Sequence, residues 1–279
     1  MIELEKIKEE AKTEGVGANL VLKERIHGLV LEFFFQKGFF SYLVFQGGTA
    51  LRMFYGGVRY SEDLDFVLRK KSAPFFNQLS AHLKILPSFL DKYLPSREIE
   101  LKTQKETLTF KRYTLTIGLE GMSAKDKTNI EIAAVPSYQN EIMMLQGKDL
   151  PLSPAVCVET LQEILSDKFC AFGSGDYVKG RDLWDIHFLL NTKKLPWDEG
   201  TKTMARKKAG DYRLRAEDFA SGFKRNLAVL EKRGAAILKA EMDLFLPQAY
   251  RNAYKNRYEA VAGGVLKVLA HFYGELEKE

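Results

Sequence analysis

The sequence predicts an α+β protein in two parts, with a mixed sheet and helices over residues 1–150 and helices alone over residues 151–279. Strand-forming runs rich in β-branched and aromatic residues occur only in the first part, at residues 42–46, 64–68, 98–103, 108–119 and 128–135. From residue 154 onward, apolar residues recur at helical spacing. The 279 residues suffice for two domains, and 46% of them are hydrophobic, as in globular proteins.

The helices of both parts can be placed along the chain. Residues 18–37 are expected to form an amphipathic helix, and residues 49–55 a short helix directly after the first strand and its two glycines. Residues 75–93 are expected to be helical with a break near Pro87, because proline removes a backbone donor. The second part should begin with a helix over residues 158–172, and glycine or proline marks its later joints.

Positive charge gathers near the C-terminal end. The chain carries 42 basic and 37 acidic residues, a formal net charge of +5. Residues 201–259 alone hold 14 basic against 7 acidic residues. Such a segment favours a polyanionic partner, although the solvated surface of a helical domain has the same composition. Tyr250, Tyr254 and Tyr258 in this segment suit base stacking, but equally the core-facing side of a helix.

The sequence predicts a cytoplasmic protein. The N-terminus lacks a basic region followed by an apolar run. The most apolar stretch, residues 29–45, is too interrupted by polar residues to span a membrane, which needs about 20 apolar residues. Cys157 and Cys170 would lie roughly 19 Å apart on one helix, beyond disulfide reach. Two free thiols indicate a reducing compartment.

The clearest chemical signal is a glycine pair followed by an Asp-x-Asp strand. Gly47, Gly48 and Thr49 stand where the first strand passes into a helix, and Asp63 and Asp65 open the second strand. Carboxylates two residues apart on a strand share a face, so they repel each other unless a cation such as Mg²⁺ or Mn²⁺ binds. A glycine turn at a helix start suits a phosphate. Either motif alone is more often a turn or an exposed strand edge, but their order favours a functional site.

Two charged residues fall on the apolar faces of predicted helices. Lys168 lies within the apolar stripe of residues 158–172, so its ammonium either snorkels to water or points at an anion in a cleft. Asp182 projects between Ile186 and Leu189 of the next helix, with Asp185 at the edge of the same face. An N-cap role for Asp182 is an equal alternative, because it follows Gly180 at a helix start.

These residues resemble the AbiEii/AbiGii-type nucleotidyltransferase toxins of type IV toxin–antitoxin systems, over roughly residues 40–190. The resemblance rests on the glycine turn and its helix, the segment from Arg59 to Phe66, Lys168, and the sequence Arg-Asp-Leu-Trp-Asp at residues 181–185. It implies a polymerase-β-like nucleotidyltransferase core followed by an all-helical C-terminal domain that contributes to the active site.

The resemblance also implies roles for particular residues. Metal ligands would be Asp63 and Asp65, and the other catalytic residues Lys168, Asp182 and Asp185. The NTP-binding residues would be Gly47, Gly48, Thr49, Arg59, Ser61 and Lys168. Glu131 is our candidate for a third metal ligand, although an ordinary exposed strand residue is an equal alternative.

The implied activity is Mg²⁺-dependent transfer of a nucleotide from an NTP to an acceptor, which in this family is the 3′ end of tRNA, with a separately encoded antitoxin. We expect an acceptor hydroxyl to attack the α-phosphorus in line and release pyrophosphate. Two alternatives remain: transfer to a small molecule or a protein, and a non-catalytic regulator that only binds nucleotide. RNA binding, unlike small-molecule binding, should weaken steeply with salt.

Overall fold

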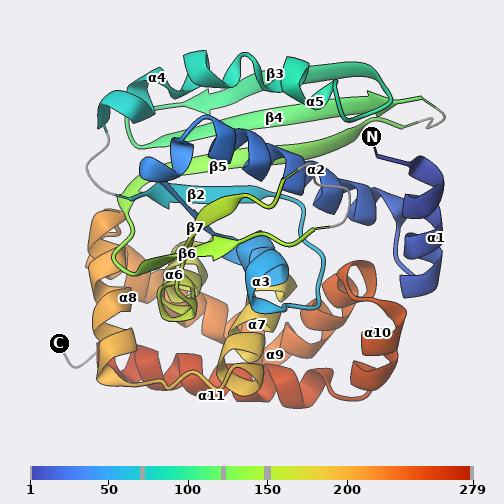
Figure 1. The fold of residues 1–279 in the computed structure, drawn as a ribbon. Coiled ribbons are helices and arrows are strands. Elements are labelled where there is room, and N and C mark those ends of the chain that lie inside the picture. Colours follow the sequence, from blue (N-terminus) through green and yellow to red (C-terminus); the bar gives the residue numbers. More distant parts are fainter. Residues whose placement is uncertain (1, 70–72, 121–123, 148–151, 277–279) are drawn as a thin grey trace. The chain divides into compact units, whose positions relative to one another are not determined.

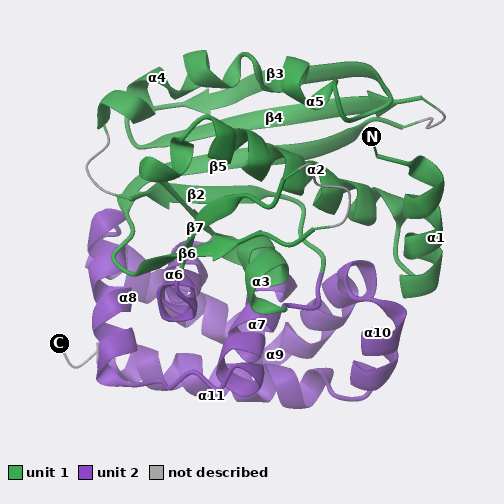
Figure 2. Ribbon diagram, viewed as in Figure 1, with its two compact units in different colours: residues 1–56, 60–159 green, residues 57–59, 160–279 purple. Residues whose placement is uncertain are grey.

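A computed structural model of the chain describes residues 2–69, 73–120, 124–147 and 152–276 (Figure 1). The chain forms two compact units, of which the first comprises residues 1–56 and 60–159 and the second residues 57–59 and 160–279 (Figure 2). The predicted boundary at residue 150 lies outside the described residues, and the division falls after Glu159.

A mixed sheet forms the centre of the first unit, in the order β3-β4-β5-β2-β1-β7-β6. β1 runs parallel to β7 and β2 runs parallel to β5, whereas the other neighbours are antiparallel. The strands are β1 (Leu43–Gln46), β2 (Leu64–Leu68), β3 (Ser96–Glu106), β4 (Phe110–Leu119), β5 (Asp126–Pro136), β6 (Asn140–Met144) and β7 (Ala155–Glu159). The predicted α+β class with a mixed sheet is therefore confirmed.

The sheet extends further along the chain than predicted. β6 has no strong strand signal, and β7 lies where strand signals were expected to have stopped. Cys157 and Val158 are on β7, so the helix expected from residue 158 begins only at Leu161. The three buried apolar residues Val156, Cys157 and Val158 can serve a central strand or a helix equally well, and parallel pairing with β1 decides for the strand.

The helices of the first unit are α1 (Leu4–Glu14), α2 (Ala18–Gln36), α3 (Gly47–Tyr55), α4 (Ala73–Leu83) and α5 (Leu86–Leu90). The predicted break near Pro87 occurs just before it, and Pro87 stands in the first turn of α5, where it needs no intrahelical donor. α2 was expected to be amphipathic, but residues on all of its sides are buried. It packs on the sheet and also contacts α1 and α5, so it has no wide solvent face.

The described residues of the second unit form helices joined by loops, with no strand. Its helices are α6 (Leu161–Ser174), α7 (Gly180–His187), α8 (Glu199–Asp211), α9 (Ala216–Phe245), α10 (Gln248–Tyr254) and α11 (Tyr258–Leu276). Aromatic rings form its core: Phe169 stacks on Trp197 at 4.2 Å, and Phe272 meets both rings edge-on. A fully buried ion pair joins Lys208 to Glu163 at 2.6 Å.

Two expectations about this part of the chain can be compared with the structure. Cys157 and Cys170 are both free, as expected; both are also buried, and they do not share a helix. Tyr258 is buried and Tyr254 packs on Trp184, while Tyr250 is 41% exposed, so the three tyrosines do not form one exposed stacking surface. None of the helices among the described residues is long and apolar enough to cross a membrane.

Candidate functional site

The glycine turn and the Asp-x-Asp motif lie against each other in the first unit. β1 pairs with β2 so that Gln46 stands opposite Asp65, and α3 begins at the next residue, Gly47. Gly47 has a φ of 79°, and a Cβ there would lie 2.6 Å from an Asp65 carboxylate oxygen. Only glycine fits this backbone conformation and this spacing. The turn therefore brings the start of α3 directly onto Asp65.

Thr49 and Asp63 are joined at the same place. The buried Thr49 hydroxyl donates a hydrogen bond of 2.5 Å to the backbone carbonyl of Asp63, which directly precedes β2. A threonine in the first turn of a helix thus fixes the segment that carries the first carboxylate. The sequence predicted Thr49 as an NTP-binding residue. In the structure its hydroxyl donates to the Asp63 carbonyl, so an NTP contact of Thr49 stays a prediction.

Glu131 lies beside Asp65, because β2 and β5 pair in parallel with these two residues in register. Its carboxylate forms an ion pair with Arg112 of β4, with 2.8 Å between Glu131 Oε1 and Arg112 Nε. Glu131 is thus well placed along the strand but engaged by a cation of the protein. Its role as a third metal ligand stays a prediction.

His27 of α2 forms hydrogen bonds that hold the segment directly before Asp63. Its Nε2 lies 2.8 Å from the Thr128 hydroxyl and 3.2 Å from the Glu62 carbonyl, and Thr128 also donates to that carbonyl. Burial lowers the pKa of His27 to about 3, with the nearby Lys23 acting in the same direction. The ring is therefore neutral at pH 7, and its Nε2–H donates to the two oxygens.

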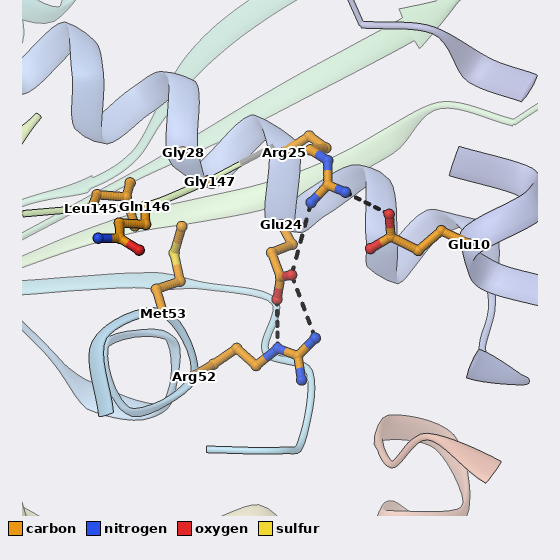
Figure 3. Close-up of a pocket in the computed structure, with 9 residues that line it drawn as sticks. All are labelled: Glu10, Glu24, Arg25, Gly28, Arg52, Met53, Leu145, Gln146 and Gly147. Atoms are coloured by element: carbon orange, nitrogen blue, oxygen red, sulfur yellow. Dashed lines mark hydrogen bonds and ion pairs between the residues drawn. The ribbon is translucent and has the colours of Figure 1, made fainter. Parts of the chain in front are cut away.

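α3 is anchored to α2 by a chain of charges beside a pocket of about 280 Å³ (Figure 3). Glu24 lies between the guanidinium groups of Arg25 and Arg52, and Glu10 lies on the other side of Arg25. The Arg52 guanidinium also stacks over the ring of Tyr60 at 4.0 Å. Because acidic and basic groups balance here, this pocket favours no anion, and its charges hold α3 in place.

The helical unit contains a second cluster, of four charged residues. Arg59 makes two parallel hydrogen bonds to Asp185, from Nε at 2.7 Å and from Nη2 at 2.6 Å. Lys168 Nζ lies 2.6 Å from Asp182 Oδ1 and 2.8 Å from Asp185 Oδ2. The side chains of Arg59 and Asp185 are 5% and 3% exposed, so this pair is buried, while Lys168 and Asp182 lie nearer to solvent.

These contacts decide between the alternative roles that the sequence left open for Lys168 and for Asp182. Lys168 does not snorkel to bulk water, since two carboxylates hold its ammonium. Asp182 is not an N-cap, because α7 begins at Gly180 and the cap residue is Lys179, which forms no side-chain cap. Asp182 stands in the first turn with its carboxylate on Lys168.

Three members of this cluster have a shifted pKa, and in each the shift favours the charged form. Burial by itself would lower the pKa of Lys168, but Asp182 and Asp185 outweigh it and raise that pKa above its usual range. Burial would likewise raise the pKa of Asp185, yet Arg59 and Lys168 hold it below its ordinary value. The pKa of Arg59 is raised, because Asp185 more than offsets its burial. Arg59, Lys168 and Asp185 thus all stay charged in spite of their burial.

Glu241 of α9 provides the cap for α7 that the sequence did not reveal. Its carboxylate accepts hydrogen bonds from the backbone N–H groups of Gly180 at 2.8 Å and Arg181 at 3.0 Å. A Cβ on Gly180 would lie 2.7 Å from the Ile237 carbonyl, so glycine is needed for this close approach. An acid far along the chain thus fixes the helix that carries Asp182 and Asp185.

Replacing Glu241 with alanine is expected to lower the free energy of unfolding by about 1–2 kcal/mol, because two N–H groups at the start of α7 lose their acceptor. Urea unfolding followed by circular dichroism measures the change. Glu231→Ala, at an exposed position on the same helix, is the matched control and should change stability by less than about 0.5 kcal/mol. Equal effects of the two substitutions would contradict the capping role.

The donor set of the first unit fits a hard divalent cation that is shared with a substrate. No group of three or more His, Cys, Asp or Glu side chains within the described ranges is arranged to hold a metal on its own. Mg²⁺, however, is commonly held by one or two carboxylates together with substrate phosphates and water. Asp63 and Asp65 provide that many oxygen ligands, next to a helix start suited to phosphate.

Comparisons with known proteins show the family and the fold of this chain. A family model described as nucleotidyl transferase AbiEii toxin, Type IV TA system, matches residues 29–266. A crystal structure of a candidate nucleotidyltransferase from H. pylori is 18% identical with a TM-score of 0.57, covering 94% of this chain and 98% of its own. JHP933 from Helicobacter pylori is 18% identical with a TM-score of 0.52, covering 94% and 95%. At such identity these structures share the fold alone. A comparison with curated proteins finds no match.

Proposed function

The chain belongs to the AbiEii nucleotidyl transferase toxin family of type IV toxin–antitoxin systems, and we propose that it transfers a nucleotide from an NTP to RNA, at the 3′ end of a tRNA, with Mg²⁺ as cofactor. The observation that carries the proposal is the fit of Gly47 to Asp65. The left-handed turn has no room for a Cβ because the carboxylate lies there. A helix start that suits phosphate and a carboxylate that suits a cation are thereby adjacent.

In the proposed reaction, an acceptor hydroxyl attacks the α-phosphorus, the α–β phosphoanhydride bond breaks, and pyrophosphate leaves. Asp63 and Asp65 would hold the metal ion, which, when bound, neutralises triphosphate charge and acidifies the attacking hydroxyl. The backbone of Gly47 and Gly48 at the start of α3 would contact phosphate, and Ser61 is proposed as a further phosphate contact.

Lys168 suits a phosphate ligand because of the contacts it already makes. An ammonium has three N–H donors, of which Asp182 and Asp185 take two. The third can meet a phosphate oxygen while the carboxylates hold the group in place. Arg59 gives its guanidinium to Asp185 in two bonds, so we assign it to positioning Asp185 in addition to the predicted NTP contact. Asp182 would orient Lys168 and the acceptor or sugar.

An RNA acceptor is supported by the charge of the helical unit. Three exposed arginines, Arg213, Arg215 and Arg225, line a hollow of about 600 Å³ and outnumber its two acidic residues, Asp176 and Asp218. Arg215 pairs with Asp218 at the exposed surface, and Arg225 donates to the Gly175 carbonyl. Exposed ion pairs contribute little and exchange readily for phosphate contacts. Binding of RNA at this surface should therefore weaken steeply with salt. A separately encoded antitoxin would be the cognate partner.

The proposal predicts that Asp63→Asn loses at least about a thousandfold of the transfer activity, because several kcal/mol of charge stabilisation depend on that ligand. Purified protein is incubated with each α-labelled NTP, Mg²⁺ and total RNA, and the labelled product is sized on a gel. Asp91→Asn, at an exposed carboxylate of the same unit, is the control and should retain activity. Label in protein or in a small molecule, or none in any acceptor, would overturn the RNA assignment; full activity of Asp63→Asn would overturn the metal site.

A further inference from the structure

Two rows of side chains cross strands β2, β5 and β4 in the first unit. One row consists of Asp65, Glu131 and Arg112, which the strand pairings place side by side. The other begins with Asp63, directly before β2, and continues with Asn129 of β5 and Thr114 of β4. Each row therefore starts at one of the two carboxylates proposed to bind metal, and each has a different chemistry.

In the Asp63 row, a single chain of hydrogen bonds runs toward the carboxylate. Asn129 Nδ2 donates to Asp63 Oδ1 at 2.9 Å, and the Thr114 hydroxyl donates to Asn129 Oδ1 at 2.8 Å. An ionised carboxylate only accepts, so the amide must turn its NH₂ group to Asp63 and its oxygen to Thr114. The Thr114 hydroxyl thus holds the amide oxygen in place, and the amide NH₂ group holds the carboxylate.

The middle residue of this row is a neutral donor, and that matters for a cation site. An amide hydrogen bond orients Asp63 without cancelling its charge, whereas a lysine or arginine would do both. In the neighbouring row the middle residue is an acid, and Arg112 binds it at 2.8 Å. The Asp63 row therefore contains no cation, and Asn129 donates to Oδ1 of the carboxylate.

We propose that Asn129, oriented by Thr114, is a positioning residue that holds Asp63 ready for the divalent cation. The proposal rests on the assignment of Asp63 as a metal ligand in the proposed function. Asn129 acts through Asp63 and touches neither metal nor substrate. Groups that orient metal ligands usually contribute tenfold to a hundredfold to metal affinity.

The test measures Mn²⁺ binding to the full chain in the presence of a non-hydrolysable NTP analogue, by electron paramagnetic resonance of free Mn²⁺. Asn129→Ala is expected to weaken Mn²⁺ binding about tenfold or more. Thr114→Val should also weaken it, by a smaller factor, and Thr114→Ser, which keeps the hydroxyl, should restore it. Thr116→Val, on the same strand and outside both rows, is the matched control and should bind Mn²⁺ as the natural chain does.

The outcomes separate this inference from the proposed function. If Asp63→Asn abolishes Mn²⁺ binding while Asn129→Ala and Thr114→Val leave it unchanged, the positioning role is wrong and the metal site stands. If Asp63→Asn binds Mn²⁺ normally, the metal site itself is wrong. Thermal unfolding of each variant is recorded alongside. Should Asn129→Ala fail to fold, the Thr114→Val and Thr114→Ser pair decides, and equal losses from Thr114→Val and Thr116→Val would overturn the proposal.

Discussion

Replacing Asp185 with asparagine is expected to destabilise the helical unit by about 3–5 kcal/mol, because it leaves the buried guanidinium of Arg59 without its hydrogen-bonded counter-ion. Asp185 accepts two hydrogen bonds from Arg59 and forms an ion pair with Lys168, and its side chain is 3% exposed. An asparagine has the same shape but no charge. It would leave a guanidinium uncompensated in a dry environment, which is the most costly way to break such a pair.

The neighbouring substitution separates stability from activity. In Asp182→Asn, Lys168 keeps Asp185, and the side chain at 182 is 19% exposed, so solvent can help to compensate. We expect a stability loss of no more than about 1–2 kcal/mol but a severe loss of nucleotide transfer. Urea unfolding gives the first quantity and the labelled-NTP assay the second. Equal destabilisation by both variants would show that Asp185 has no special structural role.

Stability should also fall as the pH drops below about 6.5, on account of His27. Burial lowers its pKa to about 3, whereas in the unfolded chain it titrates near 6.5. The contribution of a neutral histidine is therefore fully present above pH 6.5. It is lost progressively as the pH falls toward 3, because the unfolded chain binds a proton that the folded chain excludes. Between pH 7 and pH 4 this amounts to roughly 3 kcal/mol.

The measurement is urea unfolding over a series of pH values from 7 to 4, for the natural chain and for His27→Gln. Glutamine can still donate to the Glu62 carbonyl but does not titrate, so that variant should lack the part of the pH dependence that His27 causes. Carboxylates contribute to the slope in both proteins and cancel in the comparison. Identical slopes would mean that His27 is not the titrating group. Because His27 holds the segment before Asp63, weaker Mn²⁺ binding should accompany the loss of stability at low pH.

Much of the fold could be predicted from local patterns. The strand over residues 64–68 appears with the bounds expected, and the helix over residues 18–37 differs by one residue at its end. Alternation and helical spacing carry that information within a short window. β7 was missed for the opposite reason: its short apolar run fits either structure, and only the neighbouring strand β1 selects one. The short, partly exposed β6 exists because β7 offers it an edge.

The sequence by itself determined the family to which the protein belongs. A glycine pair before a helix and two aspartates at strand spacing are local features, and their meaning depends on residues that are close in the chain. The family resemblance drawn from them agrees with the family model.

Tertiary structure alone decided which partner each polar or charged side chain of the site contacts. Arg59 binds Asp185, Glu131 turns to Arg112, Asn129 holds Asp63, and Glu241 caps α7. Hydrogen bonds and ion pairs act over about 3 Å in space, whereas these partners come from distant parts of the chain. No pattern within a window of sequence records which cation finds which carboxylate. That pairing follows only when the packing of strands and helices has brought them together.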